Sequence, residues 1–550
     1  MKRISRRDFL QVGAASVAAV GLSKNSWAKT SDEFIDALVI GSGFGGSIAA
    51  LRLAQAGVKT VVLERGKRWP IINAGNTDPL APHTFATFLA PDARASWLSP
   101  VATGLIPLPI PVGPGVLELI DPTTTGPIRS KGIAVRNGAG VGGGSLAYNA
   151  IMLQPRKELF ELVFPGNIKY EEMAEVYYPR VRRILGQSVI PNNILNSSFY
   201  GSTRANLVQA QAAGMFHNSL VEYNVDFSVV QQEINGTKVP SAIDGQSWYG
   251  LNSGAKNSTD KNYLAMAEAT GNVEVLPLHW VSDITEFRND GLYQVTAQRL
   301  DSDGNVVETK TFTCRHLFMA AGATATPAML TKARDKGTLP RLDSTVGTKF
   351  GGNGDFIAAR GGVGAFQPAQ GGPCGHILFE DQNNPFSPTN MVELVVPKDF
   401  ETFALGNAPG FSLYVGLGIA PPLGYFTYDP GTDTTTINWP NLDPRLNTFS
   451  SGVNSMLDRL NAANPGSFNA FNSEDPGYKA GGGPALTAHP VGGMPMGIAT
   501  DFSGRVHGHK GLYVVDGSVV PGGNVGGVNP AFTIAALAER TMDIVIDRDF

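Results

Sequence analysis

The segment 36–66 has the pattern of a β–α–β unit, and it constrains the fold more than any other stretch of the chain. A short apolar run at 36–40 is typical of a buried parallel strand, and a second run at 60–63 is rich in β-branched residues. A helical pattern lies between them. The turn before the helix reads Gly-x-Gly-x-x-Gly, with its glycines at Gly41, Gly43 and Gly46. Length and pattern predict a Rossmann-like nucleotide-binding unit.

Each glycine of this turn has a separate task. The first makes the tight turn, the second lets the backbone approach a pyrophosphate, and the third lets helix and strand pack closely. An anionic phosphate then lies at the helix N-terminus, where free N–H groups favour it. Glu64 ends the second strand and can accept hydrogen bonds from a ribose, whereas it would repel a 2′-phosphate, which argues against NADP. The motif alone leaves FAD and NAD open.

Length, charge and cysteine content exclude several classes of protein. At 550 residues the chain is too long for one compact core, so we expect two or three domains. The net charge is −4 and no basic run occurs, which argues against nucleic-acid binding. The two cysteines, Cys314 and Cys374, cannot form a disulfide framework or a cysteine-based metal cluster. The motifs of zinc proteases, serine hydrolases and P-loop NTPases are absent.

The segment 1–28 has the pattern of a twin-arginine signal peptide. Arg6 and Arg7 precede a modestly apolar run at 12–22, and a small-x-small cleavage site follows at 26–28. The run is too short to span a membrane. Because this route carries folded proteins, we expect the cofactor to be loaded before export, and the mature protein to be periplasmic or secreted.

Two segments after the opening unit are rich in proline or glycine. The segment 67–120 is apolar and proline-rich without a regular period, which predicts long loops that either contact a lipid or partner or pack on their own domain. The glycine run at 137–145 predicts backbone pressed against a flat or phosphate-bearing group. Tyr148 and Asn149 follow it and offer polar groups close to that group.

The middle of the chain has strand patterns. We expect a strand at 271–284 and a hairpin of strands at 292–300 and 306–314 around an Asp-Gly turn. A buried strand at 317–320 then runs through Ala-Gly-Ala into a helix at 325–333. This step repeats the geometry of the opening turn, so it too can face a cofactor.

Glu393 lies in an apolar strand pattern at 391–396. By period-2 alternation it shares a face with Met391 and Val395, and neither face of the strand is polar. The carboxylate is therefore at a solvent edge or in an apolar cavity, where desolvation would raise its pKa and suit it to proton transfer. The residues alone leave both alternatives open.

The C-terminal third carries three further signals. His489 lies in a glycine- and proline-rich turn, and a strand at 512–515 ends in Asp-Gly-Ser at 516–518. Asn529 and a proline precede an apolar helix at 532–546, which is a helix start signal. The free N–H groups of that helix would point at whatever Asn529 faces.

These motifs together resemble the glucose–methanol–choline (GMC) oxidoreductase family of flavoproteins, and within it the bacterial cholesterol oxidases that bind FAD non-covalently. The similarity runs across nearly the whole chain after the signal peptide. The matching pieces are the turn at 41–46 with Glu64, GVGGGSL at 140–146, LHWV at 278–281, AAGATATP at 320–327, RDKGTLP at 334–340, HPVGG at 489–493, Asp516-Gly517-Ser518, and VNP at 528–530 with ALAER at 536–540.

The resemblance implies roles for three catalytic residues. His489 would position the substrate hydroxyl while hydride moves to the flavin, with Asn529 as its polar partner. Glu393 would move the C4 proton to C6 when a 5-ene-3-one product is isomerised to the 4-ene-3-one, which favours the active site over the solvent edge. The residues implied to bind FAD are Gly41, Gly43, Phe44, Gly45, Gly46, Glu64, Gly144, Ser145, Tyr148, Asn149, Ile151, Val281, Gly517 and Ala531.

One position departs from the cholesterol oxidase pattern. After GGGSL that pattern has Val-Asn-Gly-Gly-Met, whereas this chain has Ala-Tyr-Asn-Ala-Ile-Met at 147–152. The asparagine is displaced by one, to the spacing of the sugar-oxidising branch. No metal site is expected.

The resemblance implies an α/β fold, in which an FAD-binding Rossmann-like domain is interleaved with an α+β substrate domain built on a mostly antiparallel sheet. A sterol pocket must be large and aliphatic, and the apolar segments after Lys67 and after Gly351 are its expected lining. The implied boundaries are 33–68, 258–347 and 504–550 for the FAD-binding domain, and 69–257 and 348–503 for the substrate domain.

The implied activity is FAD-dependent oxidation of the 3β-hydroxyl of cholesterol and related sterols by O2, which gives H2O2, followed by isomerisation. The alternatives are a family oxidase or dehydrogenase for another apolar alcohol, and a lipid-binding relative without activity. We expect the sterol and O2 as partners, transient contact with a lipid membrane surface, and a monomer.

Overall fold

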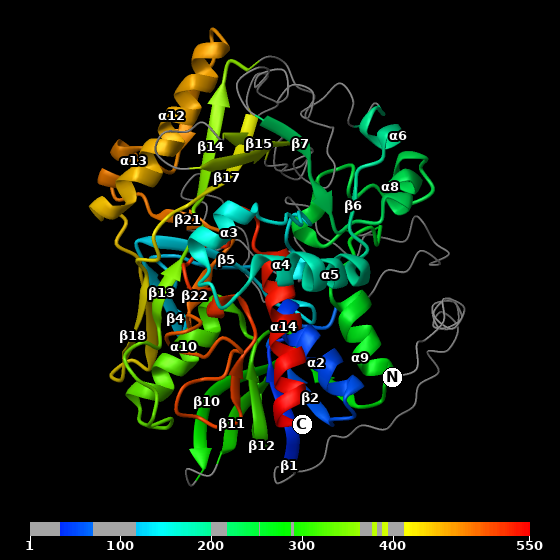
Figure 1. Cartoon of the computed structure of the whole chain (residues 1–550), viewed down its shortest axis with the longest axis vertical. Coiled ribbons are helices and arrows are strands. Elements are labelled where there is room, and N and C mark those ends of the chain that lie inside the picture. Colours follow the sequence, from blue (N-terminus) through cyan, green and yellow to red (C-terminus); the bar gives the residue numbers. More distant parts are fainter. Residues whose placement is uncertain are drawn as a thin grey trace.

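The computed structural model describes residues 34–69, 117–197, 199, 217–251, 253–287, 291–363, 377–381, 388–393 and 412–550 (Figure 1). The predicted signal peptide, most of the proline-rich segment and Cys374 lie outside the described residues. Much of the expected sterol-pocket lining, at 70–116, 364–376 and 394–411, lies outside them as well.

A seven-stranded mixed sheet forms the lower half of the molecule in Figure 1. Its order is β10-β11-β12-β1-β2-β9, and β23 pairs with β12. β1 pairs in parallel with β12 and β2, β2 pairs in parallel with β9, and β12 pairs in parallel with β23. β11 pairs antiparallel with both β10 and β12. The strands are β1 (Phe34–Ile40), β2 (Thr60–Leu63), β9 (Val273–Leu276), β10 (His279–Phe287), β11 (Leu292–Leu300), β12 (Val306–Met319) and β23 (Leu512–Val514). The predicted β–α–β unit and hairpin are confirmed.

The expected single strand at 271–284 is wrong, because the structure has two strands there. β9 pairs with β2, and β10 pairs with β11. Between them Pro277 has no N–H to donate, and Leu278 has a φ of +59°, which lies outside the extended range of regular strands. The break turns the chain back beside the nucleotide-binding turn, where Leu278 N donates to Gly66 O at 3.1 Å and His279 N to Glu64 O at 2.8 Å.

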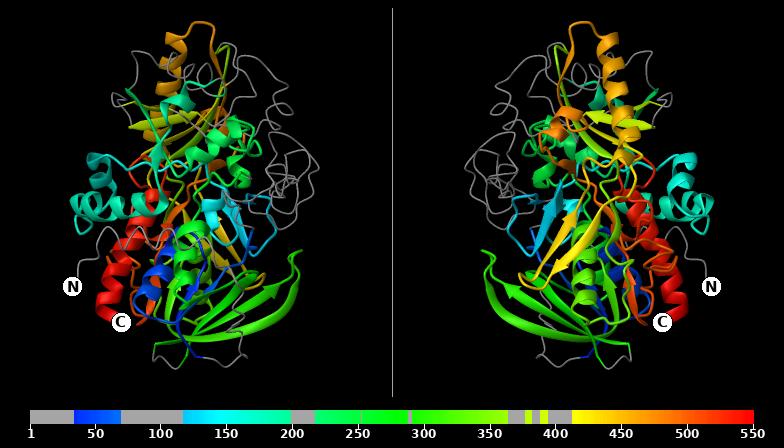
Figure 2. Two further views of the ribbon diagram at one scale, coloured as in Figure 1. Left: turned by 90° about the vertical axis from the view of Figure 1, so that its right-hand side faces the viewer. Right: turned by 90° about the vertical axis from the view of Figure 1, so that its left-hand side faces the viewer.

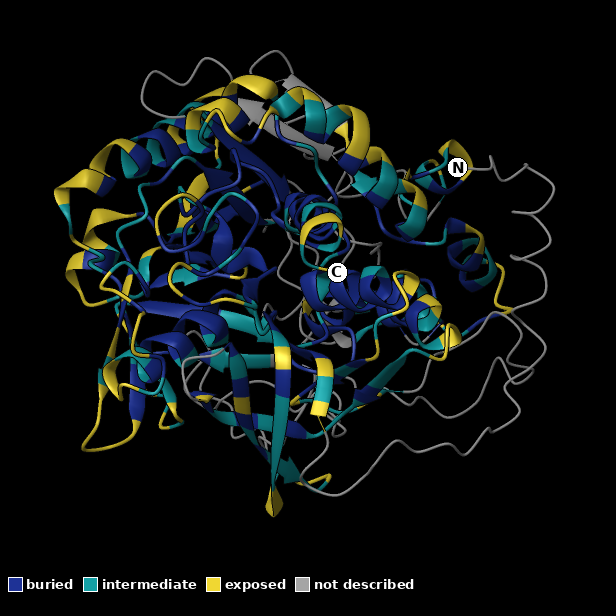
Figure 3. Cartoon of the chain, turned by 60° about the horizontal axis from the view of Figure 1, so that its bottom comes forward, coloured by how far each residue is buried: buried dark blue, intermediate teal, exposed yellow. Residues whose placement is uncertain are grey.

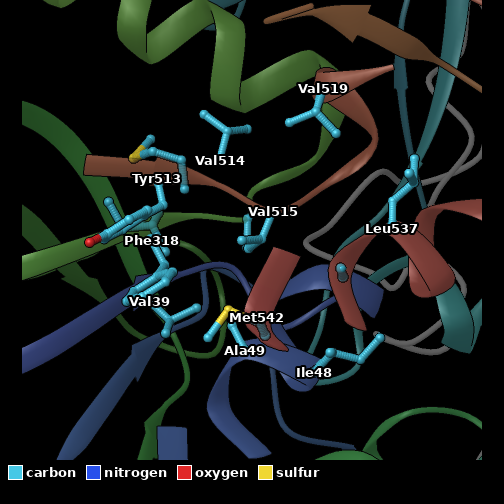
Figure 4. Packing of buried hydrophobic residues seen from close by; sticks show 14 of the residues in the cluster. Val39, Ile48, Ala49, Phe318, Tyr513, Val514, Val515, Val519, Leu537 and Met542 are labelled. Atoms are coloured by element: carbon cyan, nitrogen blue, oxygen red, sulfur yellow. The ribbon is translucent and has the colours of Figure 1, made fainter. Parts of the chain in front are cut away.

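Two long helices pack against this sheet and against each other. They are α2 (Phe44–Gln55), which follows the glycine turn, and α14 (Ala531–Asp549) at the C-terminus. Figure 4 shows fully buried side chains of both helices beside those of β1, β12 and β23: Val39, Ile48, Ala49, Phe318, Tyr513, Leu537 and Met542. Buried Glu539 of α14 accepts two hydrogen bonds from Arg52 of α2, at 2.7 and 2.6 Å. The two ends of the chain therefore share one core.

A second, six-stranded sheet forms the upper half of the molecule, as Figure 2 shows from both sides. Its strands are β7 (His217–Leu220), β14 (Asp355–Gly361), β15 (Ile377–Asp381), β16 (Thr389–Glu393), β17 (Ser412–Gly418) and β20 (Phe468–Asn472), in the order β20-β14-β17-β16-β15-β7. Every pair in it is antiparallel, which confirms the expected sheet type. The helix α12 (Asn447–Ala463) covers one face, where Val453 and Leu457 pack on Phe356 and Met391.

Short sheets connect the two halves. Their strands are β3 (Leu117–Ile120), β4 (Ile128–Lys131), β5 (Ile133–Gly138), β6 (Ser188–Val189), β8 (Glu222–Tyr223), β13 (Thr348–Gly351), β18 (Tyr425–Asp429), β19 (Thr434–Asn438), β21 (Ala485–Thr487) and β22 (Val491–Gly493). β21 pairs with β5, and β22 with β13. The chain crosses between the halves several times, although the exact domain boundaries stay a prediction.

The remaining helices lie around these sheets, and Figure 3 shows their outward faces exposed and the interior buried. They are α3 (Lys157–Val163), α4 (Tyr170–Glu172), α5 (Tyr178–Leu185), α6 (Asn192–Leu195), α8 (Phe227–Ile234), α9 (Ala265–Ala269), α10 (Gly322–Asp335) and α13 (Pro476–Ala480). α10 contains the helix expected at 325–333. Within the described residues, no helix has both the length and the apolar character needed to cross a membrane.

Candidate active site

The glycine turn packs tightly on its protein side and is open on the other. A Cβ at Gly45 would lie 2.0 Å from Val515 O, and one at Gly46 would lie 2.0 Å from Gly41 O, so any side chain there would push α2 off the sheet. A Cβ at Gly43 would meet only Gly143 Cα, at 3.9 Å. The open side of Gly43 at the start of α2 fits a pyrophosphate, because the first N–H groups of a helix have no partner within it.

Glu64 is buried and already organises the turn. Its Oε2 accepts from Ser42 N at 3.0 Å and from Ser42 Oγ at 2.6 Å, and its Oε1 accepts from Gly66 N at 2.8 Å. Each carboxylate oxygen can accept two hydrogen bonds, so Oε1 can still accept one from a ribose hydroxyl. Ser42 was missed by the sequence analysis, because a serine inside a glycine turn carries no signal of its own.

The glycine run at 137–145 packs directly against the glycine turn at 41–46. A Cβ at Gly143 would lie 2.6 Å from Gly43 Cα, and Gly142 N donates to Ser42 Oγ at 3.1 Å. Ser145 is fully buried, and its Oγ binds Gly142 O at 2.6 Å, so its side chain shapes the loop. Gly144 is exposed, and a Cβ there would have nothing within 4 Å. Gly144 therefore faces the side on which a cofactor can lie.

The segment before Asn149, the displaced asparagine, is held through its backbone by the buried side chain of Lys256. Lys256 Nζ donates to Leu146 O at 2.9 Å, to Tyr148 O at 2.6 Å and to Ser247 O. The hydroxyl of Tyr148 accepts from Asn224 Nδ2 at 2.6 Å, and burial raises the pKa of this tyrosine. Lys256 has no sequence signal, because its three partners are main-chain carbonyls that no pattern marks.

Asn149 has the clearest sign of a bound group. Its Oδ1 is buried and has no hydrogen-bond partner among the described residues. A buried acceptor without a donor costs about 1–3 kcal/mol, so the cost is avoided if a donor binds there. Ile151, by contrast, packs its side chain into the apolar cluster around Tyr223, which leaves its backbone for a cofactor.

The other predicted cofactor residues lie around the same turn. Val281 is buried in β10, which begins beside Glu64. Phe44 contacts the ring of Tyr148 edge to face, with centroids 5.6 Å apart. Gly517 begins a short 3-10 helix after β23, and Ala531 is the first residue of α14. The structure thus brings the opening turn, the glycine run and the C-terminal segment together.

Asp516 links two of the predicted cofactor-binding segments. Its carboxylate accepts from Ser518 N at 2.8 Å and from Ser518 Oγ. It also accepts from Thr326 Oγ1 at 2.6 Å and from Gly322 N at 2.8 Å, at the start of α10. Burial raises the pKa of Asp516, and the four hydrogen bonds oppose that effect. The Ala-Gly-Ala step is therefore fixed to the Asp-Gly-Ser step.

His489 and Asn529 meet as predicted. His489 lies between β21 and β22, and its Nδ1 is 2.8 Å from Asp355 Oδ1. A carboxylate only accepts, so Nδ1 carries the proton and Nε2 keeps its lone pair. Asn529 Nδ2 donates to that Nε2 at 3.1 Å, while Asn529 Oδ1 is buried without a partner in the described part of the chain. The site therefore places Nε2 of His489, a hydrogen-bond acceptor, next to the side-chain amide of Asn529.

Asp355, the first residue of β14, was missed by the sequence analysis. Its side chain is 2% exposed, and its Oδ2 accepts from Thr487 Oγ1 and from Ala488 N, both at 2.9 Å. These bonds hold the carboxylate in place beside His489. The preceding Gly-Gly-Asn-Gly is a turn signal, and no spacing relates Asp355 to a histidine 134 positions later.

Three asparagines hold the glycine-rich segment that carries Asn529. Asn353 Nδ2 donates to Val528 O at 2.8 Å, and Asn390 Nδ2 donates to Gly527 O at 2.7 Å. Asn524 Oδ1 accepts from the backbone N–H groups of the next two glycines, at 2.7 and 2.9 Å. β14 and β16 of the substrate sheet therefore fix Asn529 relative to His489.

Glu393 is the last described residue of β16, opposite Tyr414 in the neighbouring strand. In this strand Met391 packs under α12 and Asn390 donates to Gly527 O, whereas the side chain of Glu393 lies outside the described part of the structure. Nothing in the described residues places a carboxylate from this strand beside His489, so the role of Glu393 stays a prediction.

We expect Gly144→Ala to lower the affinity for FAD about tenfold, because an added methyl on the open side costs about 1–3 kcal/mol where a ring packs against it. The apoprotein should melt at the wild-type temperature, since that Cβ meets no protein atom within 4 Å. Gly166→Ala, at another glycine with open space, is the matched control. Unchanged FAD affinity in the Gly144 variant, measured by flavin fluorescence, would place the flavin elsewhere.

Models of known protein families match the sequence over most of the segments that form this site. The model described as GMC oxidoreductase matches in two parts, at residues 169–334 and 424–538, and a model described as FAD binding domain matches residues 36–70.

Among the curated relatives are two proteins named cholesterol oxidase. One, from Mycobacterium tuberculosis (strain ATCC 25618 / H37Rv), is 29% identical over 338 residues, which cover 58% of this chain and 52% of the relative. The chain thus matches about half the length of that protein. The other, from Acinetobacter baumannii, is 25% identical over 578 residues and covers 93% of this chain and 94% of the relative. An uncharacterised GMC-type oxidoreductase from Sinorhizobium fredii matches equally far at 25% identity.

Pyridoxine 4-oxidase and a formate oxidase are among the solved structures that share the fold. Pyridoxine 4-oxidase from Mesorbium loti has a TM-score of 0.62 at 15% identity, with 94% of this chain and 100% of that chain covered. A formate oxidase variant from Aspergillus oryzae has a TM-score of 0.57 at 13% identity, with 95% and 99% covered. At these identities the likeness concerns the fold alone.

Proposed function

The chain belongs to the GMC oxidoreductase family, and we propose that it is an FAD-dependent oxidase of the 3β-hydroxyl of cholesterol and related sterols. FAD itself follows from the family and from the matching FAD-binding domain, and we further propose that it is bound non-covalently. Sterols are supported as substrates by the relatives named cholesterol oxidase, one of which is similar over nearly its whole length.

The observation that carries the proposal is the orientation of His489. Asp355 holds its Nδ1 proton, so the one lone pair of Nε2, which accepts from Asn529 Nδ2 in this structure, can accept the proton of a substrate hydroxyl that displaces this amide. Asn529, 3.1 Å from that nitrogen, orients the same hydroxyl. FAD, when bound, supplies the acceptor for the hydride of the alcohol carbon. The chain thus contributes a base, an orienting amide and the backbone that binds the cofactor.

Peroxide formation tests this function. Purified, FAD-loaded protein with cholesterol in detergent and air should give H2O2 and the 3-ketosteroid in equal amounts. The same assay with short aliphatic alcohols and with an artificial electron carrier separates the alternative. Turnover of other alcohols with the carrier, but no peroxide with any sterol, would exclude the sterol oxidase and favour a dehydrogenase of another apolar alcohol.

The isomerisation is a separate proposal that depends on Glu393. We expect Glu393→Gln to oxidise cholesterol at a rate within about threefold of wild type while 5-ene-3-one accumulates, because proton transfer from C4 to C6 needs a carboxylate. The two ketones are distinguished by the absorbance of the conjugated enone. Glu233→Gln, at another carboxylate, is the control: burial raises the pKa of Glu233 to about 7, but it binds Ser241 N and Ile243 N. Conjugated ketone formed directly by the Glu393 variant would refute this role.

Export by the twin-arginine route is proposed from the sequence signal. Replacement of Arg6 and Arg7 by lysine should leave the precursor in the cytoplasm with FAD bound, because the export machinery reads this pair. Lys2→Ala is the control, and fractionation followed by immunoblotting is the measurement. Normal export of the double-lysine variant would rule out this route.

A further inference from the structure

A small cavity lies beside Asp355, and neither His489 nor Asn529 is among its lining residues. Its volume is about 20 Å³, and Asp355, Trp439, Asn441, Glu474 and Lys479 are among its lining residues. These residues come from the start of β14, the segment after β19, the segment after β20, and α13. A water molecule needs about 10–15 Å³ and two to four polar partners, so the cavity is large enough for one.

Two buried polar atoms of the lining have no partner within the described part of the chain. They are Trp439 Nε1, which can only donate, and Asn441 Oδ1, which can only accept. The Asn441 amide is oriented by its Nδ2, which donates to Gly483 O at 2.7 Å, so its oxygen cannot take that position instead. A water molecule in this cavity can accept a hydrogen bond from Trp439 Nε1 and donate one to Asn441 Oδ1.

The charged lining residues also keep unused hydrogen-bonding capacity. Among the described residues Asp355 Oδ1 accepts from His489 Nδ1 alone, so it can accept a second bond. Lys479 Nζ donates to Glu474 Oε2 and to Ser450 Oγ at 3.2 Å, which leaves its third N–H. Ser450 binds the same Oε2 at 2.7 Å, so Glu474 Oε1 is left to accept.

The ion pair of Glu474 and Lys479 is unusual for its burial, with side chains 4% and 7% exposed. Burial raises the pKa of Glu474, and the ammonium of Lys479 opposes this effect. Removing two charges from water is costly, so a buried pair contributes little to stability by itself. The pair lines the same cavity as Asp355.

We propose that this cavity holds one water molecule that bridges Asp355 to the Glu474–Lys479 pair, so that Glu474 and Lys479 are positioning residues for His489. The proposal deepens the proposed function and rests on the role given there to His489. Through the water, the pair orients the carboxylate that holds the Nδ1 proton, and the ion pair keeps the net charge behind that carboxylate near zero. The ionisable groups that line the cavity, among the described residues, are Asp355, Glu474 and Lys479, and His489 is hydrogen-bonded to Asp355.

A crystal structure of the FAD-loaded wild-type protein tests the water directly. We expect one ordered water within hydrogen-bonding distance of Asp355 and of Glu474 or Lys479, with Trp439 Nε1 or Asn441 Oδ1 as a further partner. An empty cavity, or a water that does not reach Asp355, would overturn the proposal. This experiment needs no variant, so it decides the question even if a variant does not fold.

The positioning role is tested by Glu474→Gln in the anaerobic reduction of bound FAD by cholesterol. The loss of one charge leaves the ammonium of Lys479 unpaired behind Asp355, which disfavours a further positive charge on His489. We expect the rate to fall about tenfold at saturating sterol. The pH at which the rate is half-maximal should move down by about half a unit, with little change in the half-saturating sterol concentration.

Glu286→Gln is the matched control, because Glu286, in β10, is an equally buried carboxylate that pairs with Arg341 and is not among the lining residues of the cavity. It should change stability but not the pH profile. A pH profile of Glu474→Gln that equals that of wild type would overturn the positioning role. If His489 itself proves dispensable for oxidation, the proposed function fails, whereas a missing water leaves that function intact.

Discussion

His489→Gln should reduce bound FAD with cholesterol about a thousandfold more slowly than the wild-type protein under anaerobic conditions. The reason is that glutamine provides no basic nitrogen where Nε2 now accepts from Asn529, and general base catalysis contributes about 10²–10⁴-fold. Stopped-flow absorbance of the flavin measures the rate. FAD content and melting temperature should stay close to wild type, since the His489 ring contacts the active-site residues and not the main core.

His507→Gln is the control for this variant. His507 is exposed in the same C-terminal region, and its ring has no described role at the site. Reduction of the His489 variant at a rate within about tenfold of wild type would mean that another group accepts the hydroxyl proton, since a base is expected to contribute more.

Asp355→Asn has the second-largest expected effect, a loss of about 10²–10⁴ in kcat, as is typical when a histidine loses the carboxylate that fixes its tautomer. The amide can donate to Nδ1, which moves the histidine proton to Nε2, so the nitrogen that faces the substrate no longer accepts. The remaining amide oxygen can still accept from Thr487 Oγ1 and Ala488 N, so the fold should be kept.

The measured pattern distinguishes this tautomer effect from local disorder. We expect kcat to fall with KM little changed, and Asp355→Glu to recover part of the loss because it restores a carboxylate. Asp433→Asn, which removes an exposed carboxylate paired with Lys332, should leave both constants unchanged. Equal losses in Asp355→Asn and Asp355→Glu, together with lowered stability, would show that Asp355 only supports the loop.

Local elements of this fold are predictable because their causes are local. The opening turn is recognised from glycine spacing between two apolar runs, and the structure shows why: a Cβ at Gly45 or Gly46 would lie 2.0 Å from a carbonyl oxygen. The hairpin of β11 and β12 follows from alternation around a turn. The strand expected at 271–284 fails because its apolar pattern continues through Pro277 and Leu278, where the backbone turns.

The candidate site is only partly predictable for a physical reason. His489 and Asn529 were found through the family resemblance, and they meet although 40 positions separate them. Neither Asp355 nor Lys256 can be identified as a site residue from the sequence. Asp355 acts on a histidine in a turn 134 positions away, and Lys256 binds main-chain carbonyls, so neither contact leaves a pattern of residue types along the chain.

Sterol oxidation is tested most directly by anaerobic titration of the purified, FAD-loaded protein with cholesterol in detergent, followed in the visible spectrum. We predict that the oxidised flavin bands disappear with one equivalent of sterol, that the 3-ketosteroid forms in the same amount, and that air restores the bands with release of H2O2. A spectrum that no 3β-hydroxysterol changes, in protein whose flavin dithionite reduces normally, would contradict the proposed function.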